Sequence, residues 1–347
     1  MIHLANVGDG LSLSLYDHPG AAVHVDVGGS SPARAWQGFG RAVSPASLVL
    51  SHFHLDHYVG LLQPLGSGER PLDVRNVYFP RLPEFAQRED FAVALYSTLT
   101  RVFGSATGSI EADFLDLIAA LNRGPWTYRP LSQGDLIPMG GRIAQVVWPP
   151  ARLDHPAFVG TVRTALAAYD LAREEDPSLA RIHERVYERA HNPFLATEPG
   201  RRGDEGREER WRGLEGTLDG PWEPTQAAKG FGGGVRRAVL LANQKLQRVA
   251  NRLCLSFYES DNLLFLGDLE AEEIEAVVGE LHRRGMLAFS TMITPHHGTH
   301  WDASLWSIAC RRALTSNGPR MRRHYRTEFD TLAVNSWTTA AQGDIHT

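Results

Sequence analysis

Ser51-His52-Phe53-His54-Leu55-Asp56-His57 decides how this chain is understood, because four side chains that commonly bind metal ions fall within six residues. Imidazole nitrogens and carboxylate oxygens suit zinc, manganese and iron. A single ion rarely takes four ligands from so short a run. We therefore predict that two ions share this loop, with His52 and His54 on one ion and Asp56 and His57 on the other.

The segments around this loop alternate between strand and helix character. Residues 47–51 form a short apolar run that leads directly into the histidines. Patterns of apolar residues predict further strands and helices on both sides of it. The strands are predicted at 11–16, 21–27, 76–79, 142–148, 253–258, 263–266 and 288–293, and the helices at 32–41, 271–283 and 304–311. This order, with polar residues at strand ends, predicts an α/β fold.

The HxHxDH pattern after a strand resembles the signature loop of the metallo-β-lactamase superfamily. Other segments resemble motifs of one subgroup, the hydrolase domain of the DNA-uptake protein ComEC. These are Asn6-Val7-Gly8-Asp9-Gly10, Asp26-Val27-Gly28-Gly29, Val147-Trp148-Pro149-Pro150, Leu266-Gly267-Asp268-Leu269 and Thr294-Pro295-His296-His297-Gly298. The resemblance implies a four-layer αββα sandwich with helical insertions and a metal centre at one sheet edge.

The resemblance also implies roles for individual residues. Asp268 resembles the carboxylate that bridges two ions, and one of His296 and His297 resembles a late histidine ligand. We favour His296 as the ligand, with His297 contacting substrate or stabilising charge. Asp26 resembles a carboxylate that orients a ligand histidine. The expected ligands of two divalent ions, Zn or Mn, are His52, His54, Asp56, His57, Asp268 and His296, and the catalytic candidates are Asp56 and His297.

One feature of the superfamily has no clear counterpart in this chain. Many members carry another histidine ligand between the first loop and the bridging aspartate. The candidates His155, His183 and His191 do not follow a predicted strand, so we expect surface roles for them. The ComEC-like group often lacks that histidine as well.

Two segments match no motif of the superfamily. We predict that residues 1–347 form a single domain in which 84–122 and 151–249 are insertions. Within them, helices are predicted at 91–99, 110–121, 162–171 and 180–187. Residues 198–212 are dense in charges of both signs and predict a solvated loop.

Composition excludes several other classes of protein. Cys254 and Cys310 are the only cysteines among 347 residues, which excludes a disulfide scaffold and favours a reducing, cytoplasmic compartment. No apolar run approaches the roughly 18–20 residues of a membrane span. The N-terminus lacks the basic and apolar regions of a secretion signal. A net charge of −5 argues against a nucleic-acid coat protein and leaves room for a local basic groove.

The expected reaction is hydrolysis by a metal-activated water. Arg320, Arg322 and Arg323 follow the late histidines in a segment rich in arginine, and guanidinium groups suit phosphate. We therefore favour a phosphodiesterase or nuclease that acts on nucleic acid or a nucleotide. The alternatives are a lactonase, esterase or amidase, and a non-catalytic sensor or assembly module that binds a partner protein through the insertion.

Overall fold

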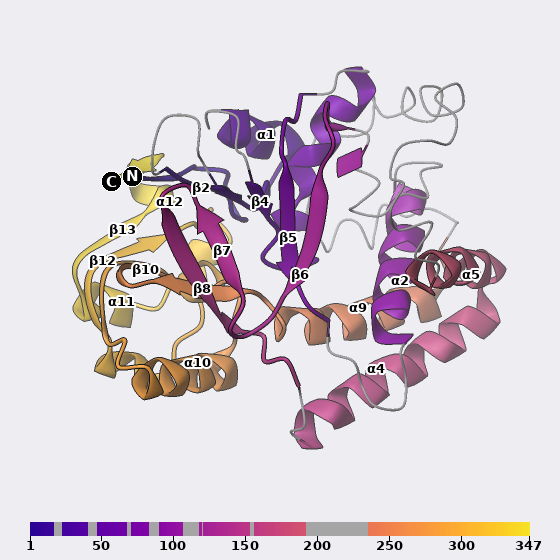
Figure 1. Cartoon of the computed structure of the whole chain (residues 1–347). Helices are drawn as coiled ribbons and strands as arrows, with labels where there is room; N and C mark the ends of the chain where they lie inside the picture. The colour runs from indigo at the N-terminus through magenta and orange to yellow at the C-terminus, as the bar shows by residue number, and fades with distance from the viewer. Residues whose placement is uncertain are drawn as a thin grey trace.

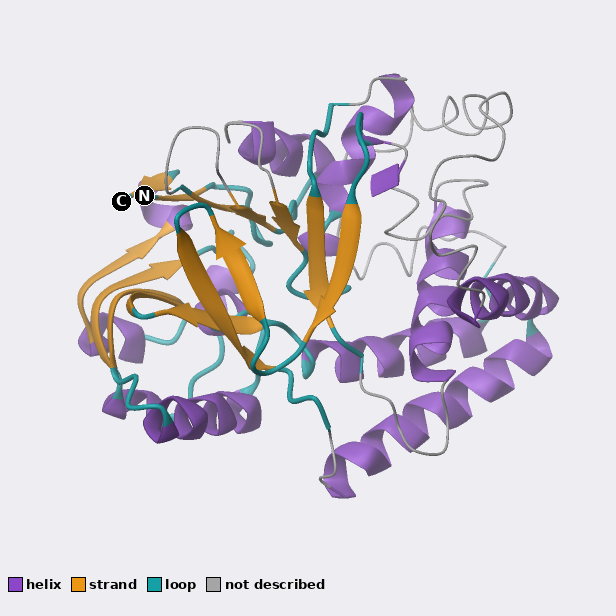
Figure 2. Cartoon of the chain, in the orientation of Figure 1, coloured by secondary structure: helices purple, strands orange, loops and turns teal. Residues whose placement is uncertain are grey.

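The computed structural model describes residues 1–16, 23–40, 47–67, 71–82, 90–106, 118–119, 121–152, 156–191 and 235–347 (Figures 1 and 2). The loop predicted at 198–212 and most of the helix predicted at 110–121 lie outside these residues. Within the described part of the chain, no helix is both long enough and apolar enough to cross a bilayer.

Two seven-stranded sheets form the centre of the molecule, and both are mixed. The first sheet has the order β14-β1-β2-β3-β4-β5-β6, antiparallel from β14 to β3 and parallel from β3 to β6. Its strands are β1 (Ile2–Leu4), β2 (Leu13–Leu15), β3 (Val23–Val25), β4 (Ser47–Val49), β5 (Asn76–Pro80), β6 (Thr127–Leu131) and β14 (Ile345–His346).

The second sheet repeats this arrangement. Its order is β13-β12-β11-β10-β9-β8-β7, parallel from β10 to β13 and antiparallel from β7 to β10. Its strands are β7 (Leu136–Met139), β8 (Arg142–Trp148), β9 (Ser256–Glu259), β10 (Asp261–Phe265), β11 (Ala288–Ile293), β12 (Ala309–Thr315) and β13 (Ala333–Thr338).

The two sheets pack face to face through one apolar core. Leu13 and Val25 of the first sheet and Phe257 and Phe265 of the second belong to the same buried cluster. Burial of such side chains from both inner faces is what holds two sheets together. Apolar side chains on the inner faces of both sheets therefore hold the sandwich together.

Helices cover the outer face of each sheet. On the first sheet, one cluster joins β4 and β5 to α1 (Pro32–Gly40), α2 (Asp90–Ala106), α4 (Pro156–Glu175), α5 (Pro177–His191), α9 (Arg237–Asn251) and the 3₁₀ helix η2 (Val59–Ser67). On the second, another cluster joins β10, β11 and β12 to α10 (Ala271–Arg283), α11 (Glu328–Leu332) and η5 (Ala303–Ser307). The αββα sandwich predicted from the sequence is thus confirmed.

The described parts of the predicted insertions are helical. Figure 1 shows α2, α4 and α5 grouped on the side of the sandwich away from α10 and α11. The long helices α4 and α9 pack against each other, and α2 packs against α5 and α9. Tyr169 of α4 is fully buried in this group. Whether these helices are insertions into a smaller ancestral domain stays a prediction.

Some predicted elements differ from those in the structure. The helix predicted at 304–311 is wrong for its last three residues, because Ala309 and Cys310 pair with Ala288 and Phe289 of β11. The sequence analysis also missed β1, β13 and β14. It missed the edge strands β6 and β7 as well. Both contain proline, which removes a backbone donor and is tolerated in strands mainly at sheet edges.

Candidate metal centre

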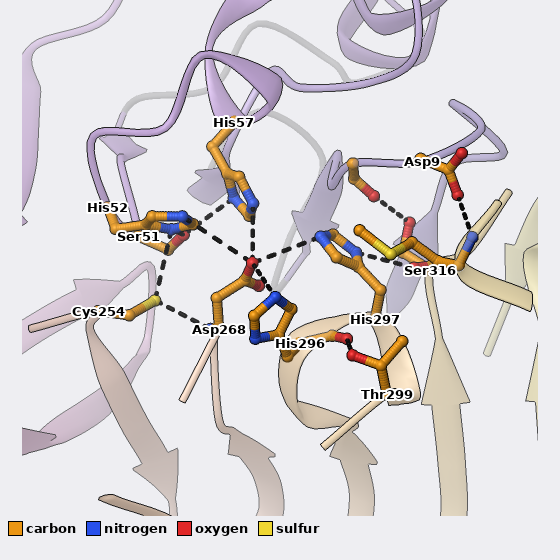
Figure 3. A network of polar contacts seen from close by, with 12 residues as sticks. Asp9, Ser51, His52, His57, Cys254, Asp268, His296, His297, Thr299 and Ser316 are labelled. Carbon is orange, nitrogen blue, oxygen red and sulfur yellow. Dashed lines mark hydrogen bonds and ion pairs between the residues drawn. The ribbon is translucent and has the colours of Figure 1, made fainter. Parts of the chain in front are cut away.

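The predicted site residues meet where strands of the two sheets end. The HxHxDH loop follows β4, Asp268 follows β10, and His296 and His297 follow β11 in the 3₁₀ helix η4 (Pro295–Gly298). The amide of His296 donates a hydrogen bond to the carbonyl of Gly267, 2.8 Å away, which ties the last two loops together. Residues more than 200 positions apart in sequence are therefore adjacent in space (Figure 3).

The Asp268 carboxylate lies at the centre of four imidazoles. Its Oδ2 atom is 3.4 Å from Nε2 of His57 and 3.5 Å from Nε2 of His297. Nε2 of His52 and Nε2 of His296 each lie 3.9 Å from the same oxygen. Two ligand atoms on one tetrahedral zinc ion are roughly 3.3 Å apart, so these spacings are those of groups able to share a cation.

Buried nitrogen atoms without hydrogen bonds support this interpretation. Within the described part of the chain, Nε2 of His52, His54, His57 and His297 is buried and has no hydrogen-bond partner. Such atoms destabilise a fold unless something else satisfies them. Divalent cations would do so for His52, His57 and His297, and imidazole with carboxylate is a suitable donor set. The residues therefore fit a metal ion.

The ligand atoms form two overlapping groups. His52, His57 and Asp268 offer atoms within 4.8 Å of one another, and so do Asp56, His57 and His297. The predicted pairing of Asp56 with His57 matches the second group. His54 belongs to neither group, although its ring lies 4.8 Å from that of His52.

Asp26 holds the imidazole of His57 from behind. The Nδ1 atom of His57 donates to Oδ2 of Asp26 over 2.7 Å, so its Nε2 lone pair points to the centre. Ser51 completes this support, since its amide and its hydroxyl donate to the two oxygens of Asp26 at 2.7 and 2.6 Å. Ser51 belongs to the histidine-rich loop of residues 51–57, but the sequence analysis predicts no role for it.

His297 is better placed than His296 to act as a ligand. Its Nδ1 atom donates to the carbonyl of Ser316 over 2.9 Å, which fixes the ring with Nε2 towards Asp268. Its side chain is 3% exposed, whereas that of His296 is 18% exposed. The sequence analysis favours His296, but the geometry favours His297.

The charges of the centre shift the pKa values of its groups. Burial lowers the pKa of the His57 imidazole, but the carboxylates of Asp268 and Asp26 outweigh it, so the pKa is raised well above its ordinary value. Burial raises the pKa of Asp268, but the imidazoles of His297, His57 and His296 lower it well below the ordinary range. Burial, together with the neighbouring His57, lowers the pKa of His52 well below its usual value. The centre thus binds protons where a cation would bind.

Backbone strain is concentrated at this centre. Four residues other than glycine have positive φ in the described chain, and three of them are Asp26, His296 and His297. A left-handed conformation costs roughly 1 kcal/mol or more per residue outside glycine. The two consecutive left-handed histidines place their Nε2 atoms 3.9 and 3.5 Å from Oδ2 of Asp268.

Cys254 is a neighbour of the centre for which the sequence analysis predicts no role in the site. Its Sγ atom accepts a hydrogen bond from the Asp268 amide at 3.0 Å and lies 3.6 Å from Nδ1 of His52. The thiol therefore helps to position one carboxylate and one imidazole. The nearness of Cys254 to Asp268 depends on the pairing of β9 with β10, which the sequence does not reveal.

The glycine-rich motifs near the N-terminus pack against the metal-binding loops. A Cβ atom on Gly28 would overlap the backbone carbonyl of Asp56, so only glycine lets this loop lie against η1 (Leu55–His57). Asp9 accepts hydrogen bonds from the amides of Gly318 and Met321 at 3.0 and 2.9 Å. These motifs therefore support the site and supply no ligand atoms to the two groups.

The predicted phosphate-binding arginines lie close to the centre in the fold. Arg322 and Arg323 belong to η6 (Met321–His324), which Arg320 immediately precedes and which packs against η4. The amide of Arg326 donates to the carbonyl of Gly298 at 2.8 Å, which joins this segment to the histidine turn.

Among the middle histidine candidates, His183 does not join the centre. His183 of α5 is held by the hydroxyl of Tyr169 at 2.8 Å and by the guanidinium of Arg173 at 2.9 Å. His191 ends the same helix, and His155 lies outside the described residues.

Comparison with known proteins gives only distant likenesses. No family model and no curated protein matches the chain. The metallo-β-lactamase fold protein YhfI from Bacillus subtilis is similar over 100% of both chains, with 8% identity and a TM-score of 0.40. The archaeal metallo-β-lactamase superfamily protein ST1585 from Sulfolobus tokodaii shares 15% identity over 43% of this chain and 55% of its own, with a TM-score of 0.25. A β-lactamase domain protein from Burkholderia ambifaria shares 23% identity over 40% of each chain, with a TM-score of 0.23. The order of strands in the two sheets and the helices that cover them establish the fold of this chain, and these distant likenesses do not.

Proposed function

We propose that this chain is a metal-dependent hydrolase of the metallo-β-lactamase superfamily that cleaves phosphodiester bonds in nucleic acid or a nucleotide. The observation that carries the proposal is the set of buried imidazole nitrogens that converge on Asp268 without hydrogen-bond partners among the described residues. Buried nitrogens without partners lower the stability of the fold, and a bound cation would offset this loss by coordinating them.

Two divalent ions, Zn or Mn, fit the two overlapping groups of ligand atoms. His52 and Asp268 would hold one, and Asp56 and His297 the other, with His54 as a further donor near His52. His57 has one free ring nitrogen, because Nδ1 is bound to Asp26, so it would complete only one of the two groups. Bound cations of this kind lower the pKa of water and stabilise charge on the attacking and leaving oxygens of a phosphodiester.

The surrounding residues orient and support the ligands. Asp26 fixes the His57 tautomer, and the Ser316 carbonyl fixes the ring of His297. His296 is the most exposed imidazole of the four around Asp268, so we assign it the contact with substrate. This reverses the roles that the sequence analysis gives to the two late histidines.

The arginines of η6 are proposed to hold the phosphate. Their segment packs against η4, and Arg320, Arg322 and Arg323 are exposed. Guanidinium groups bind phosphate oxygens in a bidentate manner. An R320Q/R322Q/R323Q variant is expected to raise KM for a single-stranded oligonucleotide with little change in kcat, since these side chains would hold phosphates that flank the bond being cleaved.

Metal-dependent hydrolysis of bis-p-nitrophenyl phosphate and of single-stranded DNA tests the proposal. Activity is expected with added Mn²⁺ or Zn²⁺, and Asp268→Asn should reduce it at least about 10³-fold by removing the shared carboxylate. Asp302→Asn is the matched control, because Asp302 caps η5 through the amide of Ser304 and is not a ligand candidate.

A lactone, ester and amide panel under the same conditions tests the chief alternative. Turnover of a lactone with none of either phosphodiester would replace the phosphodiesterase assignment while keeping the site. Bound metal with no turnover of any substrate would instead favour a sensor or assembly module. A location in the cytoplasm stays a prediction.

A further inference from the structure

A second group of metal-binding side chains lies where the two ends of the chain meet. His3 is in β1 and His346 is in β14, and the two residues are direct partners in the antiparallel register. Ile2 and Thr347 next to them exchange both backbone hydrogen bonds, at 2.8 and 2.9 Å. His3 and His346 are therefore a non-hydrogen-bonded pair, the kind in which opposing side chains lie closest.

The two imidazoles and one carboxylate converge in space. The rings of His3 and His346 stack with their centroids 4.3 Å apart and their planes 4° from parallel. Oδ2 of Asp344 lies 3.7 Å from Nε2 of His3, while Oδ1 of Asp344 accepts the amide of Asn6 at 2.8 Å. One ligand atom from each of the three residues lies within 4.8 Å of the other two.

We propose that His3, Asp344 and His346 bind one divalent transition-metal ion of the Zn²⁺ type, at a site that shares no residue with the centre around Asp268. Two imidazole nitrogens and one carboxylate oxygen are a donor set that Zn²⁺, Ni²⁺ and Cu²⁺ favour. The Asn6 amide holds the carboxylate with its second oxygen towards His3, so part of the site is formed before the ion binds.

Solvent reaches the group from the side of His346. That ring is exposed, and the Asp344 side chain is 19% exposed, whereas His3 is buried. Binding requires the ring of His346 to tilt out of the stack, which an exposed side chain does by rotating about its terminal torsion. The remaining positions around the ion would be filled by water.

Binding would fasten the C-terminal strand to the sheet. β14 has two residues and lies at the edge of the first sheet, so its pairing with β1 is brief. An ion held by His3 of β1, by His346 of β14 and by Asp344 just before β14 would link residues 341 and 343 positions apart in the sequence. Its role would therefore be structural, and the hydrolase proposal does not depend on it.

The full-length protein, freed of metal by chelation and dialysis, provides the test. Titration with Zn²⁺ by calorimetry, with metal content measured after dialysis, is expected to show one ion fewer in His346→Ala than in the unmodified chain. Asp344→Asn should show the same loss, because the amide oxygen still accepts the Asn6 amide but carries no charge. Asp268→Asn should retain the terminal ion while it loses ions from the main centre.

Hydrogen–deuterium exchange of backbone amides gives a second readout, which does not depend on enzymatic activity. Zn²⁺ should slow hydrogen–deuterium exchange in a peptide covering 340–347 at least about tenfold, and this protection should vanish in His346→Ala. His324→Ala is the matched control, because His324 is also an exposed histidine but lies in η6. Unchanged ion counts in both His346→Ala and Asp344→Asn would overturn the proposal, as would equal Zn²⁺ protection in His346→Ala and the unmodified chain.

Discussion

Asp26 accepts a 2.7 Å hydrogen bond from Nδ1 of His57, and both side chains are fully buried. The bond leaves Nε2 of His57 directed at Asp268, 3.4 Å away. One carboxylate thus fixes the tautomer of the imidazole that both groups of ligand atoms share. Carboxylate–histidine pairs of this kind tune metal affinity in many proteins.

Replacing Asp26 by Asn should weaken metal binding about 10- to 100-fold, because the amide holds the His57 tautomer less firmly and makes the ring less basic. Calorimetric titration with Zn²⁺ measures this loss. Asp302→Asn, the same change at a residue that belongs to neither group of ligand atoms, should bind Zn²⁺ as the unmodified chain does. Equal affinities for the two variants would contradict the role assigned to Asp26.

Metal binding should release protons and strengthen as pH rises. His57 has a pKa raised well above its ordinary value: burial lowers it, but Asp268 and Asp26 raise it more. The pKa of His297 is also raised, because Asp268 outweighs burial. These rings bind protons below their raised pKa values, so a cation must displace them. The apparent affinity for Zn²⁺ should rise at least about tenfold per pH unit between pH 6 and 7.5.

Calorimetry in buffers of different ionisation enthalpy counts the released protons. Asp26→Asn should flatten the pH dependence, because it removes one of the two carboxylates that raise the pKa of His57. An affinity for Zn²⁺ that does not change from pH 6 to pH 7.5 would show that the centre does not hold these protons.

Gly28→Ala should destabilise the fold and impair metal binding. The new methyl group would meet the Asp56 carbonyl and the His57 backbone, which are main-chain atoms and give way poorly. A loss of about 3 kcal/mol in the free energy of unfolding is expected. Gly279→Ala in α10 is the control: its Cβ meets no atom within 4 Å among those present, and it should gain about 0.5–1 kcal/mol from helix propensity. Urea unfolding measures both, and similar stabilities would contradict the packing argument.

His24 should make the protein sensitive to acid. Burial, and to a lesser extent the nearby His3, lowers its pKa from 6.5 to about 3, and its ring contacts the hydroxyls of Ser12 and Ser14. Below pH 6.5, His24 becomes protonated in the unfolded chain but stays neutral in the folded chain. The free energy of unfolding therefore falls as the pH drops towards 3.

From pH 7 to pH 5 this single residue should cost about 2 kcal/mol of folding free energy. His24→Gln, which keeps a polar side chain but does not titrate there, should lose that much less stability than the unmodified chain over the same interval. An equal loss of unfolding free energy in His24→Gln and the unmodified chain, measured by urea unfolding at pH 7 and pH 5, would contradict the prediction.

The sequence by itself predicted eight of the fourteen strands in the described part of the chain and the loops that meet at the centre, and the αββα class followed from the resemblance of its motifs to the metallo-β-lactamase superfamily. Apolar alternation within strands is local, and the His52-to-His57 spacing fixes four side chains on one short loop. The strand of β8 (Arg142–Trp148) and the helix α10 were predicted with their observed bounds for this reason. The edge strands β6 and β7 were missed because each contains proline and exposes half or more of its residues, which weakens the apolar pattern.

Only the tertiary structure decided which side chains face one another. The advantage of His297 over His296 comes from the Ser316 carbonyl, which follows a strand that pairs with β11. The support from Ser51 and Cys254, and the meeting of His3 with His346, likewise depend on contacts between distant segments. Such contacts are set by the register of strands within each sheet and by the packing of the two sheets, and no local pattern in the sequence encodes them.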